Sequence, residues 1–442
     1  MTSNEAFQHV PPEAYQPSRR RFLRRFAGGV AGAGLLPAFG FLGHRKPLDA
    51  LAQRAARLAP GQVGDEDFWR MVKDQFPLRP GLILMNAANL CPSPYPVAET
   101  VFHYTRDVNA DASFQNRGKF NDLHEAALEA LARYMGTDAD EVVITRNTSE
   151  SNNLVIAGLD LKTGDEVVLW DQNHPTNNVA WDVRAQRYGF TVKRVETPAD
   201  PQSADDLIEP FAEAMTANTR VLSFSHVSNV SGVGLPAREL CALARERDIL
   251  TLIDGAQTFG SHQVDLHDVG CDFYTGSAHK WFLGPKEGGL LYVRRERVDA
   301  LWPSVVGVGW EQARERGARK FGTMGQRDDA MLAAVGKAVD FLETIGNARI
   351  EARVRALATA IKTRVREHFP QATFRTPFEP ELSGGVVIFN VPEVDFRAAF
   401  ASLYEEHHLG CALRGDNLRL CPHIYNTMDE VERVVEVVKG LA

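Results

Sequence analysis

Helical and strand-like hydrophobic spacings alternate along most of this chain. Leu123, Ala127, Leu131 and Tyr134 form one apolar stripe, which predicts an amphipathic helix over residues 121–134. Apolar, β-branched runs predict strands at residues 141–145, 166–170, 190–195, 220–224, 250–253 and 288–293. Helical stretches such as residues 236–247 separate these runs. The alternation predicts an α/β fold with a largely parallel sheet and helices on both faces.

The pattern changes after residue 327. Long helices are expected at residues 330–345 and 348–369, and a mixture of short strands and helices follows, which is typical of a smaller α+β domain. We therefore expect four parts: a signal peptide and linker at 1–52, a segment packing on the small domain at 53–113, a large domain at 114–327 and a small C-terminal domain at 328–442.

Composition and charge narrow the class of protein. The 442 residues are 44% hydrophobic and 24% charged, an ordinary globular balance, and the formal net charge is -8. Residues 1–46 are basic, so the remainder is more acidic than the whole chain. An acidic body argues against a nucleic-acid partner.

The N-terminus resembles a twin-arginine export signal. Residues 18–24 read Ser-Arg-Arg-Arg-Phe-Leu-Arg, and a Gly/Ala-rich apolar run follows from residue 26 to residue 42. Small residues suited to cleavage occur at 38–40 and at 50–52, and the sequence does not choose between them. We expect the twin-arginine translocase as a partner and a periplasmic or otherwise exported protein. A basic start that stays on the protein is the alternative.

The cysteines are not arranged as metal ligands. Five are present, without a CxxC pair and without Cys/His zinc spacing, so no metal site is expected. The odd count argues against a full disulfide framework, although one or two bridges remain open in an oxidising compartment.

Two charged residues carry the candidate chemistry. Asp254 ends an apolar strand and is followed by Gly255, and ligands in open α/β sheets bind at the carboxyl ends of strands. Lys280 lies between His279 and Trp281, an apolar and cationic setting that lowers the pKa of a lysine. Pyridoxal 5'-phosphate (PLP) chemistry needs such an amine together with a carboxylate for its ring nitrogen. Taken alone, Asp254 also fits a turn or a helix N-cap.

The run from Ile253 to Leu290 carries the motifs Asp-x-x-Gln, Ser-x-His-Lys and Gly-Gly-Leu. It resembles the class V aminotransferase group of fold-type I PLP enzymes, which includes cysteine desulfurases and isopenicillin-N-epimerase-like proteins. The resemblance extends from about Met85 to the C-terminus. It implies PLP as cofactor, a large domain with a mostly parallel seven-stranded sheet, a smaller α+β domain, and a homodimer with a shared active site.

The matching positions imply roles for the residues around the lysine. Lys280 would form the Schiff base and shuttle protons, Asp254 would pair with the pyridinium nitrogen, and Gln257 would donate to the phenolic oxygen. The implied phosphate ligands are Ser277, His279, Thr148 and Ser149, the last two in a turn at a helix N-terminus. Thr148 also fits a plain capping box.

Further matches lie at a distance from Lys280 in the sequence. The resemblance implies that His174 stacks on the cofactor ring and that Asn229 lies near the phenolic oxygen. It implies that Thr323, after Gly322, reaches the phosphate of the neighbouring subunit. Arg419 matches the arginine that binds the substrate carboxylate, and Arg414 is a second candidate. A surface salt bridge is the alternative for either arginine.

The reaction is predicted from the absence of a cysteine between Arg414 and Arg419. Family desulfurases carry a nucleophilic cysteine on a loop between the positions of Arg414 and Arg419, and this stretch is only Gly-Asp-Asn-Leu here. A cysteine desulfurase or lyase is therefore a weaker alternative. The short tail and the export signal favour an isopenicillin-N-epimerase-like branch with an exported, siderophore-tailoring member that acts on pyoverdine. We expect transamination or oxidative deamination of an amino acid or peptide natural product, with epimerisation and a non-catalytic PLP-fold protein as alternatives.

Overall fold

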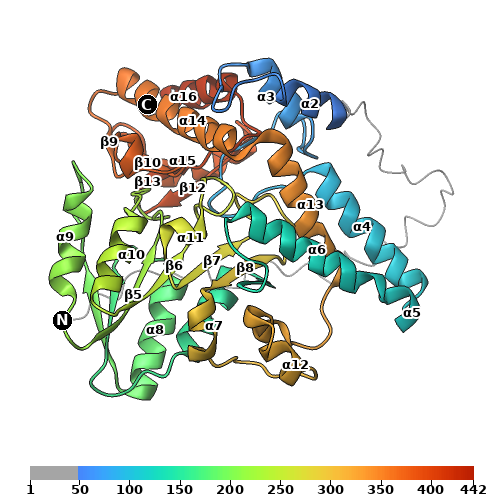
Figure 1. Cartoon of the computed structure of the whole chain (residues 1–442). Helices are drawn as coiled ribbons and strands as arrows, with labels where there is room; N and C mark the ends of the chain where they lie inside the picture. Colours follow the sequence, from blue (N-terminus) through green and yellow to red (C-terminus); the bar gives the residue numbers. More distant parts are fainter. Residues whose placement is uncertain (1–47) are drawn as a thin grey trace, which may run out of the picture. The chain divides into compact units, whose positions relative to one another are not determined.

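The computed structural model describes residues 48–442, which form one compact unit. Its centre is a seven-stranded sheet in the order β2-β8-β7-β6-β5-β3-β4 (Figure 1). The strands are β2 (Val142–Thr145), β3 (Glu166–Trp170), β4 (Thr191–Val195), β5 (Thr219–Ser225), β6 (Leu250–Asp254), β7 (Phe273–Ser277) and β8 (Gly289–Val293). Only β8 runs against the others, so the expected mostly parallel sheet is confirmed.

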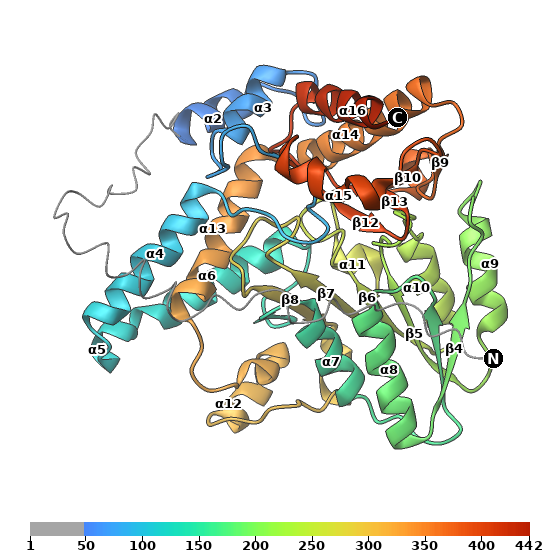
Figure 2. The ribbon, with the colours of Figure 1, turned by 180° about the vertical axis from the view of Figure 1, so that it is seen from behind.

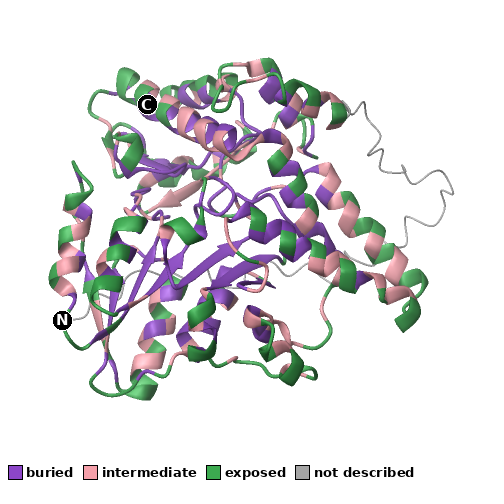
Figure 3. Cartoon of the chain, viewed as in Figure 1, coloured by how far each residue is buried: buried purple, intermediate pink, exposed green. Residues whose placement is uncertain are grey.

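Alternate residues of the buried strands enter two different apolar cores, as the period of two in a strand requires. On one face the strands pack against α6 (Lys119–Tyr134), α9 (Asp205–Ala214), α10 (Ala237–Glu246) and α13 (Asp329–Ile345). On the other face they pack against α7 (Thr148–Gly158) and α8 (Pro175–Tyr188), seen from behind in Figure 2. Because both faces are covered, the strands are buried almost throughout (Figure 3).

A second, smaller sheet carries the residues expected to meet the substrate. Its order is β12-β13-β10-β9, all antiparallel, with strands β9 (Thr373–Phe374), β10 (Val387–Asn390), β12 (Ala412–Arg414) and β13 (Asn417–Leu420). It shares an apolar core with α14 (Asn347–His368), α15 (Phe396–Glu405) and α16 (Met428–Leu441). The smaller α+β C-terminal part is therefore confirmed.

The first described helices, α2 (Leu48–Ala55) and α3 (Glu66–Lys73), are anchored by buried arginines of α14. Arg353 has no exposed surface, pairs with Glu66, and lies 4.9 Å from the ring centroid of Trp69. Arg349 donates to the carbonyl groups of Ala55 and Leu58 at the end of α2. The start of the described chain is thus part of the packed body.

The remaining described elements complete the scaffold. Strand β1 (Ile83–Leu84) pairs in parallel with β11 (Leu409–Gly410), and α13 packs along α4 (Tyr95–Ala110) and α6. Shorter elements are α5 (Phe114–Arg117), α11 (Leu266–Val269), α12 (Trp310–Arg314), η2 (Arg295–Ala300), η3 (Gly317–Gly322) and η4 (Pro380–Leu382). No described helix has the length and apolarity needed to cross a membrane.

The predicted export signal lies at residues 18–42, outside the described residues. One of the two expected cleavage positions, residues 50–52, falls inside α2, where Leu51 is fully buried. The domain boundaries stay predictions. Two contacts bear on them: β1 joins residues 83–84 to the C-terminal part, and α13, assigned to the small domain, packs mainly on α4 of the 53–113 segment and on α6 of the large domain.

Candidate active site

Lys280 and Asp254 are brought together by neighbouring strands. Asp254 is the last residue of β6, and Lys280 follows β7 by three residues; β6 and β7 pair in parallel with Asp254 opposite Thr275. Burial lowers the pKa of the Lys280 ammonium below its ordinary value, and the Asp254 carboxylate acts in the opposite direction. The lowered pKa gives Lys280 a larger neutral fraction, which is the form that attacks a carbonyl carbon.

Both carboxylate oxygens of Asp254 are held in place. Oδ1 accepts the backbone N–H of Ala256 at 3.0 Å, and Oδ2 accepts Nδ2 of Asn152 at 2.9 Å. The Oδ1 atom of Asn152 in turn accepts the hydroxyl of Thr275 at 2.8 Å. Asn152 was not predicted from the sequence, although it lies one helical turn after Thr148 and so faces the same way on α7.

Thr148 and Ser277 meet at the N-terminus of α7. The backbone N–H of Thr148 donates to the Ser277 hydroxyl at 2.9 Å, and the two hydroxyls lie 2.7 Å apart. Asn147, not Thr148, is the N-cap, because its side chain accepts the N–H of Glu150. The capping-box reading of Thr148 is therefore wrong. Thr148 is the first helical residue and lies at the positive end of the helix dipole.

Of the other expected phosphate ligands, Ser149 is exposed beside Thr148. His279 is half-buried, and its Nδ1 has no hydrogen-bond partner among the described residues. Burial, assisted by the charges of Lys280 and Lys286, lowers the pKa of His279 to about 4. His279 is therefore neutral at pH 7 in this structure, with one ring nitrogen left for a ligand.

His174 is the N-cap of α8, where its Nδ1 accepts the backbone N–H of Thr176 at 3.2 Å. Burial and then the charge of Lys280 lower the pKa of His174, and the charges of Arg414 and Arg419 add to this. The imidazole thus lies within electrostatic range of the amine and of both arginines. This is the neighbourhood that a ring-stacking residue requires.

Gln257 is buried beside the same cluster. Its Nε2 donates to the carbonyl of Ala88 at 3.2 Å, and its Oε1 accepts the indole N–H of Trp281 at 2.8 Å. The Trp281 contact fixes which end of the amide carries the donors. A primary amide has two N–H groups, so one remains for a second acceptor such as a cofactor oxygen.

The small domain contributes two guanidinium groups. Arg414 and Arg419 lie on the same face of the β12–β13 hairpin, since Ala412 pairs with Arg419 and Arg414 with Asn417. Nε of Arg414 and Nη1 of Arg419 each lie 3.4 Å from the backbone carbonyl of Asn229, which follows β5. Asn229 therefore meets the two arginines through its main chain.

A segment missed by the sequence analysis, residues 86–93, links both domains at this site. Nη2 of Arg419 donates to Oδ1 of Asn86 at 2.9 Å, and the N–H of Cys91 donates to the carbonyl of His279 at 2.8 Å. The carbonyl of Ala88 also receives Gln257. The segment thus touches the arginine, the glutamine and the histidine neighbouring Lys280.

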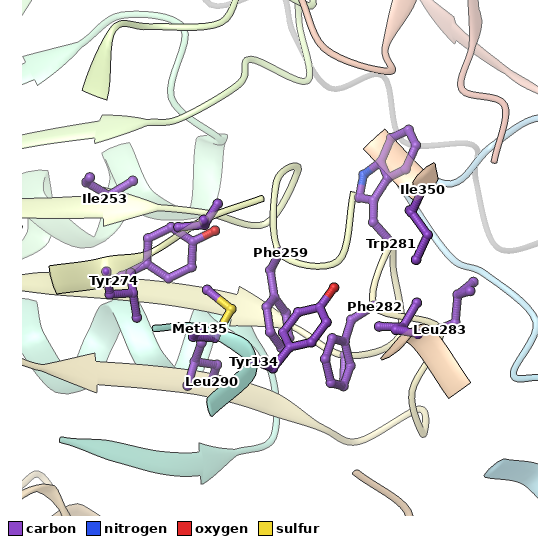
Figure 4. Packing of buried hydrophobic residues seen from close by; sticks show 14 of the residues in the cluster. Tyr134, Met135, Ile253, Phe259, Tyr274, Trp281, Phe282, Leu283, Leu290 and Ile350 are labelled. Carbon is purple, nitrogen blue, oxygen red and sulfur yellow. The ribbon is translucent and has the colours of Figure 1, made fainter. Parts of the chain in front are cut away.

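Packing behind Lys280 holds its turn in place. Gly260 has a positive φ of +95°, and a Cβ there would lie 2.3 Å from the Cα of Phe282. The rings of Phe259 and Phe282 stack with centroids 4.2 Å apart, as Figure 4 shows beside Tyr134 and Trp281. A glycine at position 260 therefore allows the backbone to approach the segment that follows the lysine.

Thr323 lies apart from the other predicted residues. It follows η3, which packs on β2 at the edge of the sheet, and its hydroxyl donates to the carbonyl of Lys320. None of the contacts given for the described residues joins it to Lys280 or Thr148. Its predicted contact with the phosphate of a neighbouring subunit stays a prediction.

A candidate cation-binding cluster lies elsewhere. Asp138, Glu141 and His267 place ligand atoms within 4.8 Å of one another. Glu141 already accepts Thr137 and His267 through Oε2, and the N–H of Arg295 through Oε1. Both oxygens of this carboxylate already accept hydrogen bonds from within the chain, so no metal is assigned.

Comparison with known proteins identifies the family. The family model described as "Aminotransferase class-V" matches residues 84–434. The chain belongs to the class V aminotransferase family. It is 32% identical to the isopenicillin N epimerase of Amycolatopsis lactamdurans, covering 85% of this chain and 98% of the relative. It is 28% identical to a probable cysteine desulfurase of Pyrococcus abyssi, covering 84% of this chain and 96% of the relative.

Solved structures agree on the fold. An apo cysteine desulfurase from Thermococcus onnurineus NA1 matches with a TM-score of 0.76 and 24% identity, covering 87% of this chain and 99% of the other. A lysine-to-alanine mutant of C-DES, with glycine covalently linked to its PLP cofactor, matches with a TM-score of 0.75 and 21% identity, covering 84% and 99%. The predicted fold-type I architecture is thereby confirmed.

PLP is the cofactor of this family member, and the residues present fit it. Lys280 and Asp254 offer the amine and the carboxylate, and α7 offers a helix N-terminus with two hydroxyls for the phosphate. The partnerless Nδ1 of His279 is a further polar atom with room for a ligand. When bound, PLP supplies an electron sink that acidifies the Cα–H of an attached amino acid.

Proposed function

We propose that this chain acts at the amino-bearing carbon of an α-amino acid or peptide natural product, by transamination or oxidative deamination. One observation carries the proposal: the amine of Lys280 lies within electrostatic range of Asp254, Arg414 and Arg419. A nucleophilic amine, an acid partner for the cofactor ring and cationic binding groups for a carboxylate are thus gathered in one place.

Each residue has a defined task in this proposal. Asp254, fixed by Asn152, keeps the cofactor's ring nitrogen protonated. Arg419 binds the α-carboxylate and so fixes which bond at Cα faces Lys280. With PLP bound, the neutral Lys280 amine would be placed to accept the proton from the substrate Cα and to return it. Thr148 and Ser277 hold the phosphate.

A cysteine desulfurase reaction is disfavoured by the state of the thiols. Burial raises the pKa of Cys91, Cys241 and Cys411 to about 12, and it also raises the pKa of Cys271 and Cys421. The thiolate is the nucleophile in sulfur transfer, so these thiols are unsuited to it. The hairpin turn between Arg414 and Asn417 consists of two residues, neither of them cysteine.

The test uses the PLP-loaded protein and a panel of free amino acids. We expect the cofactor to be converted to its amine form, with release of a keto acid. The Lys280→Ala variant should lose the visible absorption band of the lysine-bound cofactor, and Lys286→Ala, a change to a neighbouring exposed lysine, should keep it. Sulfide release from cysteine, or a wild-type protein that stays colourless with PLP, would contradict the proposal.

Epimerisation is the second candidate function. It is favoured by the 32% and 30% identity to isopenicillin N epimerases from Amycolatopsis lactamdurans and Streptomyces clavuligerus. An epimerase needs an acid/base group on the face opposite Lys280, and His174 is the candidate because the two share electrostatic range. Tyr104, on α4, packs against His103 and Phe120 instead. Exchange of the Cα–H with solvent deuterium, without formation of the amine form, would identify this reaction.

A homodimer with shared sites is proposed from the position of Thr323. Gly307 lies against the Thr323 carbonyl, and the same loop exposes Trp302, Val306 and Val308, which are large apolar side chains typical of an interface. Mixing inactive Lys280→Ala and Thr323→Trp subunits tests it. Heterodimers should regain activity, because one of their two sites combines both native residues; no recovery after subunit exchange would refute the shared site.

Export and the siderophore class remain proposals drawn from the N-terminal sequence. We expect Arg19→Lys together with Arg20→Lys to retain the protein in the cytoplasm, with fractionation as the measurement. Processing at residues 38–40 is favoured over 50–52, because the latter would remove part of α2 with its buried Leu51. None of the relatives reported above is described as siderophore-tailoring, so substrate screening must include α-amino acids outside that class.

A further inference from the structure

The two guanidinium groups of the β12–β13 hairpin have no acidic partner. In the described part of the chain, no carboxylate lies within ion-pair distance of Arg414 or Arg419, whereas Arg397, which also contacts this hairpin, pairs with Asp416. Their acceptors are the carbonyls of Asn229 and Leu413 and the amide oxygen of Asn86. Neutral acceptors satisfy hydrogen bonds but leave both positive charges uncompensated.

Burial makes this arrangement costly without a ligand. Arg419 is 2% exposed, and its Nε has no hydrogen-bond partner among the described residues. Arg414 is partly buried, and burial followed by the charge of Arg419 lowers its pKa to about 10. Two adjacent cations in such a setting require anions from outside the chain.

The cofactor does not supply these anions. Its phosphate would be held by Thr148 and Ser277 at the N-terminus of α7, and Asp254, which accepts a hydrogen bond from Asn152, would pair with the ring nitrogen. One arginine is satisfied by the α-carboxylate of the substrate. The second is left for another anionic group of the same molecule.

The geometry sets the spacing of these groups. The arginines are diagonal neighbours across an antiparallel pair, a relation that places their backbones about 7–8 Å apart. One guanidinium nitrogen of each arginine lies 3.4 Å from the Asn229 carbonyl oxygen, so the two guanidinium groups lie closer together than the two backbones. Two carboxylates separated by a short aliphatic chain match this separation.

We propose that the substrate is an α-amino acid whose side chain ends in a carboxylate, with Arg419 binding the α-carboxylate and Arg414 binding the distal one. This inference rests on the proposed function, because it assigns the substrate class to the same site. It predicts selection for dicarboxylic over amide or aliphatic side chains of equal length.

Binding of unreactive ligands to the PLP-loaded protein tests this without turnover. Glutarate and glutaramate have the same chain length and differ in one terminal charge, so calorimetry isolates the second carboxylate. We expect glutarate to bind at least about tenfold more tightly, as one charge-assisted, bidentate pair supports. Arg414→Gln should abolish the difference while leaving glutaramate affinity within about twofold, and Arg397→Gln, a matched outward-facing control, should change neither.

If Arg414→Gln weakened the binding of glutarate and of glutaramate equally, the proposal would be overturned, because both arginines would then bind one carboxylate. Equal affinity in the wild type, or binding of neither ligand, would overturn it as well. Failure of the proposed function looks different: an Arg414-dependent preference for glutarate would persist while no amino acid converted the cofactor or exchanged its Cα–H.

Discussion

Asn152 is expected to control how tightly the protein holds PLP, although it does not touch the reacting atoms. Its amide is 2% exposed and bridges the Thr275 hydroxyl and the Asp254 carboxylate. Replacing it with alanine removes one of the two hydrogen bonds found at the Asp254 oxygens. A hydrogen bond to a charged group contributes about 1.5–3 kcal/mol. Its loss leaves the Asp254 carboxylate less firmly oriented and weakens the pairing with the ring nitrogen.

If half of that free energy, about 0.75–1.5 kcal/mol, reaches the bound cofactor, PLP affinity falls by about 3- to 12-fold, since about 1.4 kcal/mol corresponds to a factor of ten. The assay is titration of the apoprotein with PLP, followed by the visible band. Asn153→Ala is the matched control, because the side chain of this partly buried neighbour bonds the backbone of Ser149 and not Asp254. A PLP dissociation constant within twofold of wild type in Asn152→Ala, with urea stability unchanged, would refute the positioning role.

Three further changes address stability. Gly260→Ala places a Cβ against backbone atoms and should lower the free energy of unfolding in urea by about 1–3 kcal/mol. Gly64→Ala, whose Cβ would meet no atom within 4 Å, should leave it unchanged. Equal effects of the two changes would contradict the close packing at Gly260. Arg353→Met removes a fully buried guanidinium from the partly exposed Glu66, which still accepts the backbone N–H of Met428, and should lower the stability by about 1–3 kcal/mol, against less than about 1 kcal/mol for Arg364→Met, whose ion pair with Glu432 is more exposed. His423 is a buried neutral histidine with a pKa of about 4, so between pH 6.5 and 4 it takes up a proton mainly when the protein unfolds. The urea midpoint should therefore fall as the pH is lowered across that window. A midpoint that does not change with pH would refute this.

The sheet could be predicted from sequence because its strands are buried on both faces. The strand at residues 166–170 was predicted at the bounds observed, since a continuous apolar run marks it. Strand β7 was missed, because Phe-Tyr-Thr-Gly-Ser contains a glycine and small polar residues. The structure explains the glycine: a Cβ at position 276 would lie 2.6 Å from the Phe259 ring.

Within the site, residues in local motifs were predictable and residues joined over long sequence distances were not. Asp254 was predicted from the end of an apolar strand and Lys280 from its neighbours His279 and Trp281, and the pairing of β6 with β7 brings them together. The contacts of residues 86–93 arise only in the folded chain: Asn86 meets Arg419 across 333 positions and Ala88 meets Gln257 across 169. No spacing rule connects such residues, because their proximity depends on β1 pairing with β11.

The two sheets supply different parts of the site, which explains why the family resemblance fixes the cofactor but not the reaction. The large sheet supplies Lys280, Asp254 and the α7 terminus, whose geometry suits any amine bound to PLP. The small sheet supplies Arg414 and Arg419, which both contact the backbone carbonyl of Asn229, and Arg419 also contacts Asn86. Since those cations decide which carboxylates bind and how Cα is oriented toward Lys280, substrate and reaction are expected to depend on the β12–β13 hairpin. Changes in that hairpin should alter selectivity while leaving PLP binding intact.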